Sequence, residues 1–144
     1  DCTDSVRGRL GMSQMIVMDT HVWFWWINLE HQRFSASMQT ALEESDSLGI
    51  SVVSCYEIAL AAQRGRLLLP SPASQWFVEA LEPSGVQLLM LSSIIANRAV
   101  DLTAIHRDPF DRMIIATALV YDAMLLSLDG VFHHYPELQG WLLK

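Results

Sequence analysis

DPFDRMIIATALVYDAMLLSLD, residues 108–129, contains the clearest helix signal in the chain and, directly after it, a buried strand. Asp108 is a good N-cap, and Pro109 suits the first helical position because its missing N–H would have no partner there. A helix is therefore predicted from this point to about Asp122. The short apolar run Met124–Leu128 then predicts a buried strand. A helix that leads directly into a buried strand is typical of α/β proteins.

The rest of the chain repeats this alternation of strands and helices. The other predicted strands are Met15–Met18, Leu48–Val53, Val86–Leu91 and, as a short edge strand, Leu138–Leu143. The other predicted helices are His21–Leu29 (a helix or turn), Ser35–Glu44, a helix opened by Ser54–Glu57 and ended by Gly65, Ala73–Glu82, and a helix capped by Ser92 that reaches about Asp101. Strands that alternate with helices form a parallel sheet covered on both faces. The predicted fold class is α/β, with three α/β/α layers around a central, mainly parallel sheet of four to five strands.

The length and composition predict one globular domain. The chain has 144 residues, of which 51% are hydrophobic and 17% charged, enough to bury a core. Residues 1–13 are polar and unlike a secretory signal, so we expect an N-terminal tail or cloning remnant there and a single domain over residues 14–144. No apolar run approaches the length of a membrane span, and Cys2 and Cys55 make no disulfide framework. A cytoplasmic protein with no membrane partner is expected.

Acidic residues follow the predicted strands or begin the predicted helices. They are Asp19 and Asp129 at strand ends, and Glu57 and Asp111 at helix starts. Residues just past the ends of parallel strands share one edge of the sheet, where open α/β sheets bind ligands. Carboxylates gathered in one cleft repel one another unless a cation is present. The sequence therefore predicts a divalent-metal site and phosphate chemistry.

Each acidic residue also has an ordinary structural interpretation. Ser54-x-x-Glu57 matches a capping box, in which both side chains bond to backbone N–H groups. Asp108 is assigned first as an N-cap, with support of the cleft as a second role. Asp129-Gly130 is a turn dipeptide. If all of these structural interpretations were the whole explanation, several acidic residues would have gathered at one sheet edge by coincidence. Their common location therefore favours the metal site.

Charge and motifs exclude several classes of protein. The net charge of −7 argues against broad, nonspecific nucleic-acid binding, but it allows a small basic rim around an acidic cleft. The sequence contains no P-loop, dinucleotide-binding fingerprint or nucleophile elbow. Phosphatases and receiver domains that place acids after strands usually set a lysine against the phosphate, and the only lysine here is Lys144. The spacing of the five histidines matches no zinc signature.

Four segments resemble, in order, the motifs of PIN-domain proteins. They are DTHVW at 19–23, SCYEIA at 54–59, HRDPFDRMIIATA at 106–118 and LSLDGVF at 126–132. The resemblance runs from about Met15 to Leu143 and is strongest to VapC-like toxins of bacterial type II toxin–antitoxin systems. It implies a PIN-like nuclease domain and an endoribonuclease, a hydrolase that depends on Mg²⁺ or Mn²⁺.

The resemblance also implies roles for particular residues. The expected catalytic residues and metal ligands are Asp19, Glu57, Asp111 and Asp129. Asp19 and Asp111 are expected to bind one ion directly, and the other two to act through water or on a second ion. Supporting roles are implied for Thr20 and Ser127. Apart from the resemblance, supporting roles are also expected for Asp108, which begins the helix, and for Arg112, which is next to Asp111. Arg112 either contacts an RNA phosphate or lies on a solvated helix face.

The same resemblance implies partners. They are an RNA substrate, a VapB-like antitoxin whose C-terminal segment covers the cleft, and a second copy of the chain in a homodimer. The aromatic residues at 23–26 are compatible with an interface, although packing in the core explains them as well. Two other interpretations remain open: a catalytically silent PIN-like binding module, in which the acids are caps and turns, and a nuclease that acts on DNA.

Overall fold

The centre of the molecule is a parallel sheet of five strands in the order β3-β2-β1-β4-β5. The computed structural model describes residues 14–105 and 107–143, so the predicted tail at 1–13, His106 and Lys144 lie outside the described residues. The strands are β1 (Ile16–Met18), β2 (Leu48–Ser51), β3 (Gln87–Leu89), β4 (Met124–Leu126) and β5 (Leu142–Leu143). The prediction of a parallel sheet with a short C-terminal edge strand is confirmed.

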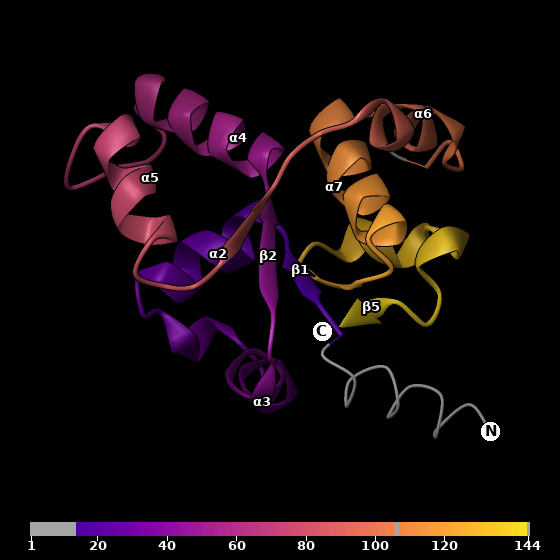
Figure 1. Ribbon diagram of the computed structural model, residues 1–144, viewed down its shortest axis with the longest axis horizontal. Coiled ribbons are helices and arrows are strands. Elements are labelled where there is room, and N and C mark those ends of the chain that lie inside the picture. The colour runs from indigo at the N-terminus through magenta and orange to yellow at the C-terminus, as the bar shows by residue number, and fades with distance from the viewer. Residues whose placement is uncertain (1–13, 106, 144) are drawn as a thin grey trace.

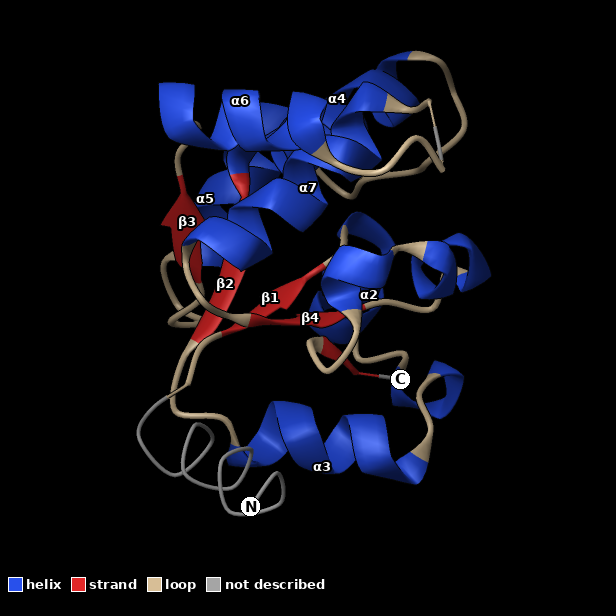
Figure 2. Ribbon diagram, turned by 90° about the vertical axis from the view of Figure 1, so that its right-hand side faces the viewer, coloured by secondary structure: helices blue, strands red, loops and turns tan. Residues whose placement is uncertain are grey.

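Helices cover both faces of this sheet. They are α2 (Thr20–Ile27), α3 (Ala36–Glu44), α4 (Val52–Gln63), α5 (Ala73–Leu81), α6 (Ser93–Asp101) and α7 (Pro109–Val120), with short 3₁₀ helices at His31–Arg33, Gly130–His134 and Pro136–Leu138. In Figure 1, α2 and α5 lie on one side of β1 and β2, and α6 and α7 lie on the other. Met38 and Leu42 of α3 pack in the same core as α2 and α5. Figure 2 views the molecule from the side of α6 and α7 and shows β3, β2, β1 and β4 in this order across the sheet. The three-layer α/β/α prediction is confirmed.

Two hydrophobic cores hold the layers together because side chains alternate along each strand. Ile16 and Met18 of β1 belong to one core, which includes the fully buried Trp23 of α2. Val17 belongs to the other core and packs with Ile115 of α7. Strands buried on both faces are continuous apolar runs, which is why the short strands could be recognised in the sequence.

The carboxyl ends of β1, β2 and β4 lie at the same edge of the sheet because all of the strands run in parallel. Helix α2 begins directly after β1, with Asp19 as its N-cap, and α4 begins directly after β2, with Ser51 as its N-cap. Asp19 is held at this edge by its backbone N–H, which donates to the carbonyl of Leu126 (3.0 Å). These short connections bring helix N-termini and their polar side chains to one place.

Strand β2 ends earlier than the predicted strand Leu48–Val53. The hydroxyl of Ser51 accepts a hydrogen bond from the N–H of Val53 (3.1 Å), and this cap starts the helix despite the β propensity of the two valines that follow it. Ser54 therefore lies inside α4, and the capping-box interpretation of Ser54 and Glu57 is wrong.

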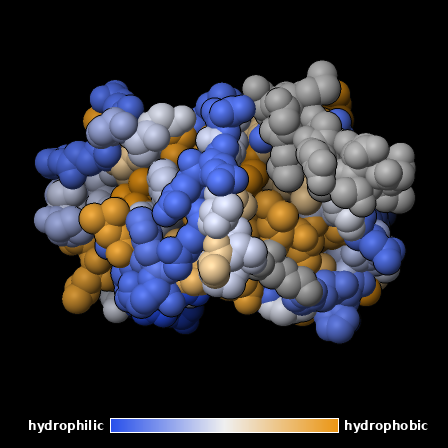
Figure 3. Space-filling model, turned by 90° about the horizontal axis from the view of Figure 1, so that it is seen from below, coloured by the Kyte–Doolittle hydropathy of each residue, from blue (hydrophilic) through white to orange (hydrophobic). Residues whose placement is uncertain are grey.

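Apolar side chains reach the surface between hydrophilic ones, as the face in Figure 3 shows. The most exposed large apolar residues on α6 are Ile94 (67%) and Val100 (77%), close in sequence to the exposed Met90. Singly exposed apolar residues such as these are normal on a protein surface. Among the residues that the structure describes, no helix is long and apolar enough to cross a membrane.

Candidate active site

All four predicted acidic residues line one pocket at the carboxyl edge of the sheet. The residues that line it are Asp19, Thr20, His21, Trp25, Glu57, Asp108, Asp111, Leu128 and Asp129. They come from the ends of β1 and β4 and from the first two turns of α2, α4 and α7. The structure thus brings together carboxylates that are up to 110 positions apart in the sequence, Asp19 and Asp129 being the most distant pair. Their roles as ligands remain a prediction.

Asp19 is buried and held by hydrogen bonds at both of its oxygens. Oδ1 accepts from the N–H of Val22 (2.9 Å), and Oδ2 accepts from the hydroxyl of Ser127. Burial raises the pKa of Asp19 because it disfavours the charged form, and the negative charge of Asp129 raises it further. The hydrogen bonds from Ser127 and Val22 act in the opposite direction, but they do not overcome the effect of burial.

Ser127 connects two of the acidic residues. Its Oγ donates to Asp19 and accepts from the N–H of Asp129 (3.0 Å). Asp129 in turn accepts at Oδ1 from the N–H of Val131 (3.0 Å), so it caps the 3₁₀ helix that follows. The turn interpretation of Asp129 therefore holds, and the same side chain also lines the acidic pocket.

Glu57 lies in the second turn of α4 and points into the pocket. Thr20 Oγ1 donates to its Oε1 (2.6 Å) and also lies 2.8 Å from the hydroxyl of Ser54, so Ser54 supports Thr20. Burial raises the pKa of Glu57, the hydrogen bond from Thr20 opposes this rise, and the charge of Asp108 adds to it. The contact between Thr20 and Glu57 is consistent with the supporting role predicted for Thr20.

The most closely spaced carboxylates are Glu57, Asp108 and Asp111, each of which offers an oxygen within 4.8 Å of the other two. Asp108 accepts from the N–H of Phe110 (2.9 Å) as the N-cap of α7, which confirms that part of the prediction. Oxygens on opposite sides of one bound divalent ion lie about 4–5 Å apart, so this group fits a single cation. Asp19, expected to be a principal ligand with Asp111, lies outside this closest group.

The sequence alone gives Asp108 a smaller role than its position in the pocket indicates. Its N-cap role fully explains its residue type, so the sequence suggests no more than support of the cleft. The signal that could have identified it is the Asp-x-x-Asp spacing of 108 and 111, because residues three apart on a helix are neighbours on one face.

The side chain of Arg112 is bonded to a neighbouring helix outside the acidic pocket. Its guanidinium donates to the backbone carbonyls of Ala99 (3.1 Å), Leu102 (2.8 Å) and Thr103 (3.0 Å). These carbonyls lie at or just after the C-terminal end of α6, where helices leave acceptors without partners. Arg112 therefore ties α6 to α7. Its contact with an RNA phosphate stays a prediction.

The donor set fits a hard divalent cation. Five carboxylates share one pocket, and two of them have a raised pKa because burial and neighbouring charges disfavour ionisation. A bound cation relieves that repulsion, and oxygen-only ligands are those that Mg²⁺ and Mn²⁺ prefer.

Stability of the metal-free protein is expected to fall as pH rises. The folded state holds protons on Asp19 and Glu57 above the ordinary carboxyl pKa of about 4, so it binds more protons than the unfolded state until pH passes the raised values. Melting temperature measured against pH in chelator, for the wild type and for Glu57→Gln, checks this. As pH rises above about 4, the melting temperature of the wild type should fall relative to that of the variant. A wild type whose melting temperature rises relative to the variant would contradict the expected direction.

Removal of the Ser127 hydroxyl is expected to weaken the site and the fold together. Ser127→Ala leaves Oδ2 of Asp19 without its donor and the N–H of Asp129 without an acceptor, at a cost of about 1–3 kcal/mol in the free energy of unfolding. Ser127→Thr keeps the hydroxyl and serves as the matched control. Urea unfolding in the presence of Mg²⁺ measures both, and equal losses for the two variants would show that the hydroxyl is unimportant.

The fold and the acidic pocket define the class. A model of the PIN domain matches residues 16–138, and the chain belongs to this family. The chain is 32% identical over 125 residues to ribonuclease VapC22 of Mycobacterium tuberculosis, covering 85% of this chain and 94% of that protein. The resemblance to PIN-domain proteins and to their VapC branch is therefore confirmed.

Solved structures have the same fold. The crystal structure of VapBC2 from Rickettsia felis, bound to a DNA fragment from its promoter, matches 90% of this chain and 97% of the solved chain with a TM-score of 0.65 at 13% identity. FitAcB from Neisseria gonorrhoeae matches 90% and 97% with a TM-score of 0.59 at 18% identity. A toxin–antitoxin complex from Klebsiella pneumoniae matches 90% and 96% with a TM-score of 0.57 at 20% identity.

Proposed function

We propose that this protein is a ribonuclease toxin of the VapC type, which hydrolyses RNA phosphodiester bonds with the help of a divalent metal ion and is neutralised by a cognate antitoxin. The convergence of five carboxylates in one pocket, in a chain 32% identical to a ribonuclease, carries the proposal. The other two interpretations predict different behaviour: a silent binding module cleaves nothing, and a DNA nuclease prefers DNA.

Each residue of the acidic pocket has a proposed role. Glu57, Asp108 and Asp111 would hold the ion, and Asp19, at the end of β1, would be a further ligand. A bound Mg²⁺ or Mn²⁺ supplies an activated water near neutral pH and neutralises charge that develops on the phosphate. Thr20 keeps Glu57 oriented, and Ser127 keeps Asp19 oriented, through the hydrogen bonds already described. No serine or cysteine nucleophile is required.

Cleavage assays on purified protein test the proposal. Single-stranded RNA and DNA of the same sequence are incubated with the protein in chelator, Mg²⁺ or Mn²⁺. We expect cleavage of RNA only, and only with metal. Faster cleavage of DNA would favour the DNA nuclease, and no cleavage under any condition would favour the silent module.

The proposal includes a VapB-like antitoxin, a homodimer and a cytoplasmic location where RNA is available. A small reading frame beside the gene is the expected source of the antitoxin. The exposed apolar residues near and on α6, such as Met90, Ile94 and Val100, offer contact area for either protein partner. Light scattering on the isolated chain, and on the chain expressed with the neighbouring frame, distinguishes a monomer, a homodimer and a larger complex.

A further inference from the structure

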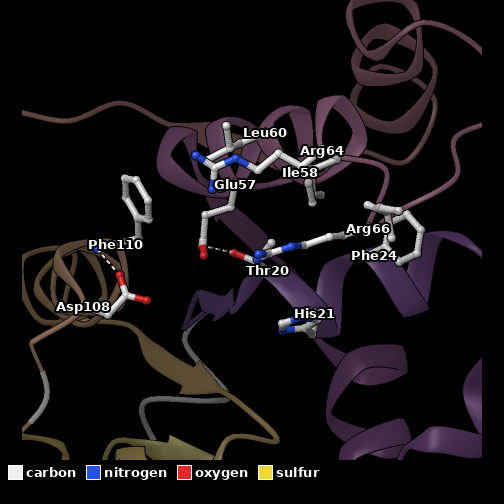
Figure 4. A pocket seen from close by; sticks show the side chains of 12 residues that line it. Thr20, His21, Phe24, Glu57, Ile58, Leu60, Arg64, Arg66, Asp108 and Phe110 are labelled. Atoms are coloured by element: carbon white, nitrogen blue, oxygen red, sulfur yellow. Dashed lines mark hydrogen bonds between the residues drawn. The ribbon is translucent and has the colours of Figure 1, made fainter.

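A second pocket adjoins the acidic one and carries positive charge. The two pockets share Thr20, His21, Glu57 and Asp108, so they form one continuous depression. Arg64 and Arg66 line the second pocket, and Figure 4 shows both side chains extending from the C-terminal end of α4 back toward Glu57 and Thr20. A ligand in the acidic pocket can therefore extend directly to these two guanidinium groups.

The backbone fixes where the two arginines lie. Gly65 adopts a left-handed conformation (φ 73°), and the N–H of Arg66 donates to the carbonyl of Ala61 (2.9 Å), which closes a tight helix-ending turn. Arg64 lies seven positions after Glu57, two helical turns or about 10 Å along the same face of α4. One face of this helix thus carries negative charge near its middle, at Glu57, and positive charge at its C-terminal end, at Arg64.

Neither arginine side chain has a bonding partner among the residues that the structure describes. The side chains of Arg64 and Arg66 make no ion pair or hydrogen bond with any described residue, although acidic side chains share their pocket. In contrast, Arg33 pairs with Glu30 (3.2 Å), and Arg112 is bonded to the carbonyls of α6. In a chain with a net charge of −7, RNA needs local cations of this kind.

We propose that Arg64 and Arg66 bind backbone phosphates of the RNA strand next to the one that is cleaved, and so position the substrate at the acidic pocket. This inference rests on the proposed ribonuclease function. Arginine is suited to the task because its planar donors match phosphate oxygens. Apolar side chains, including Phe24, Ile58 and Phe110, also line this pocket and offer a base a surface on which to pack.

The charge pattern favours RNA over the antitoxin as the occupant of this pocket. A protein segment that neutralises the acidic pocket brings cations, and these would be repelled by Arg64 and Arg66. RNA meets both requirements, because one phosphate reaches the acids through a divalent ion while its neighbours meet the arginines directly.

The double variant Arg64→Gln/Arg66→Gln tests the inference, with Arg98→Gln as the matched control. Arg98 lies on α6 in a surface depression with Ser93, Ile94 and Asn97, outside the acidic pocket and the arginine-lined pocket. Affinity for a short single-stranded RNA is measured by fluorescence anisotropy against salt concentration, in an Asp111→Asn background that prevents cleavage. We expect a loss of affinity of about 10²-fold at low salt. The slope of log K against log salt should become shallower by about 1.4, or about 0.7 for each phosphate that the protein no longer binds.

Steady-state cleavage with Asp111 intact completes the test. The double variant should raise KM with kcat little changed, and stabilisation by Mg²⁺ should stay at the wild-type level. If the wild type cleaves RNA with metal but the double variant keeps its KM and salt slope, the arginine inference is overturned while the ribonuclease proposal stands. If the double variant resists its antitoxin yet binds RNA normally, the pocket serves the protein partner instead. If the wild type does not cleave RNA at all, both proposals fail.

Discussion

Asp111→Asn is expected to reduce RNA cleavage by about 10³-fold or more. The substitution removes one carboxylate from the closely spaced group of Glu57, Asp108 and Asp111, which would hold the ion. Metal ions supply several kcal/mol of transition-state stabilisation, and about 4 kcal/mol corresponds to about 10³ in rate. The rate of cleavage at saturating RNA and millimolar Mg²⁺ is the measurement.

The fold of this variant should remain intact. Asp108 caps α7 through its own side chain, so loss of the charge at 111 leaves the cap in place and removes repulsion within the pocket. Asp46→Asn makes the same chemical change at an exposed residue before β2 and should retain full activity. Loss of helical circular dichroism in step with activity would instead assign Asp111 a structural role.

Stabilisation by metal is the second large effect that we expect. A ligand that binds only the folded state raises the free energy of unfolding by about 2.7 kcal/mol at a concentration one hundred times its Kd. For a chain of this size each kcal/mol shifts the melting temperature by about 2–4 °C, so saturating Mg²⁺ or Mn²⁺ should raise it by several degrees. The rise is expected because the acidic pocket is destabilising in the absence of metal.

Controls separate binding from general screening of charge. Sodium chloride at matched ionic strength should produce a much smaller shift, since it screens the carboxylates without being coordinated. Asp111→Asn should be as stable as the wild type in chelator, or more so, and should lose most of the shift with Mg²⁺, whereas Asp46→Asn should keep it. An equal shift in all three proteins would place the bound metal elsewhere.

The sequence was sufficient for the layers of the fold and for the approximate position of the acidic pocket. Strands buried on both faces, such as Met124–Leu126, are short apolar runs that stand out between amphipathic helices. Because the strands are parallel, the residues after them had to meet at one edge, and this is where Asp19 and Asp129 lie. The conjunction of several acids was a better guide than any one of them, since Asp129 alone is fully explained by its turn.

Other features depend on tertiary contacts that local patterns do not encode. Ser54 matched a capping box, but Ser51 starts the helix, and Ser54 supports Thr20 from within α4. Arg112 is adjacent to an acidic residue in the sequence, yet its guanidinium turns away to the end of α6.

Arg64 and Arg66 belong to no sequence motif that would have identified them as binding residues. They lie near the acidic pocket because two helical turns separate Arg64 from Glu57 and because the left-handed Gly65 turns the chain back at Arg66. Neither feature produces a recognisable pattern in the sequence.

Anomalous diffraction from crystals soaked in Mn²⁺ tests most directly whether the carboxylates converge to bind a cation. We expect an anomalous peak in the acidic pocket, within coordinating distance of oxygens from Asp111 and at least one of Glu57, Asp108 and Asp19, and no such peak in Asp111→Asn crystals. If crystals soaked at saturating Mn²⁺ show no anomalous peak in the pocket, although the same protein cleaves RNA, the carboxylates do not form the metal site.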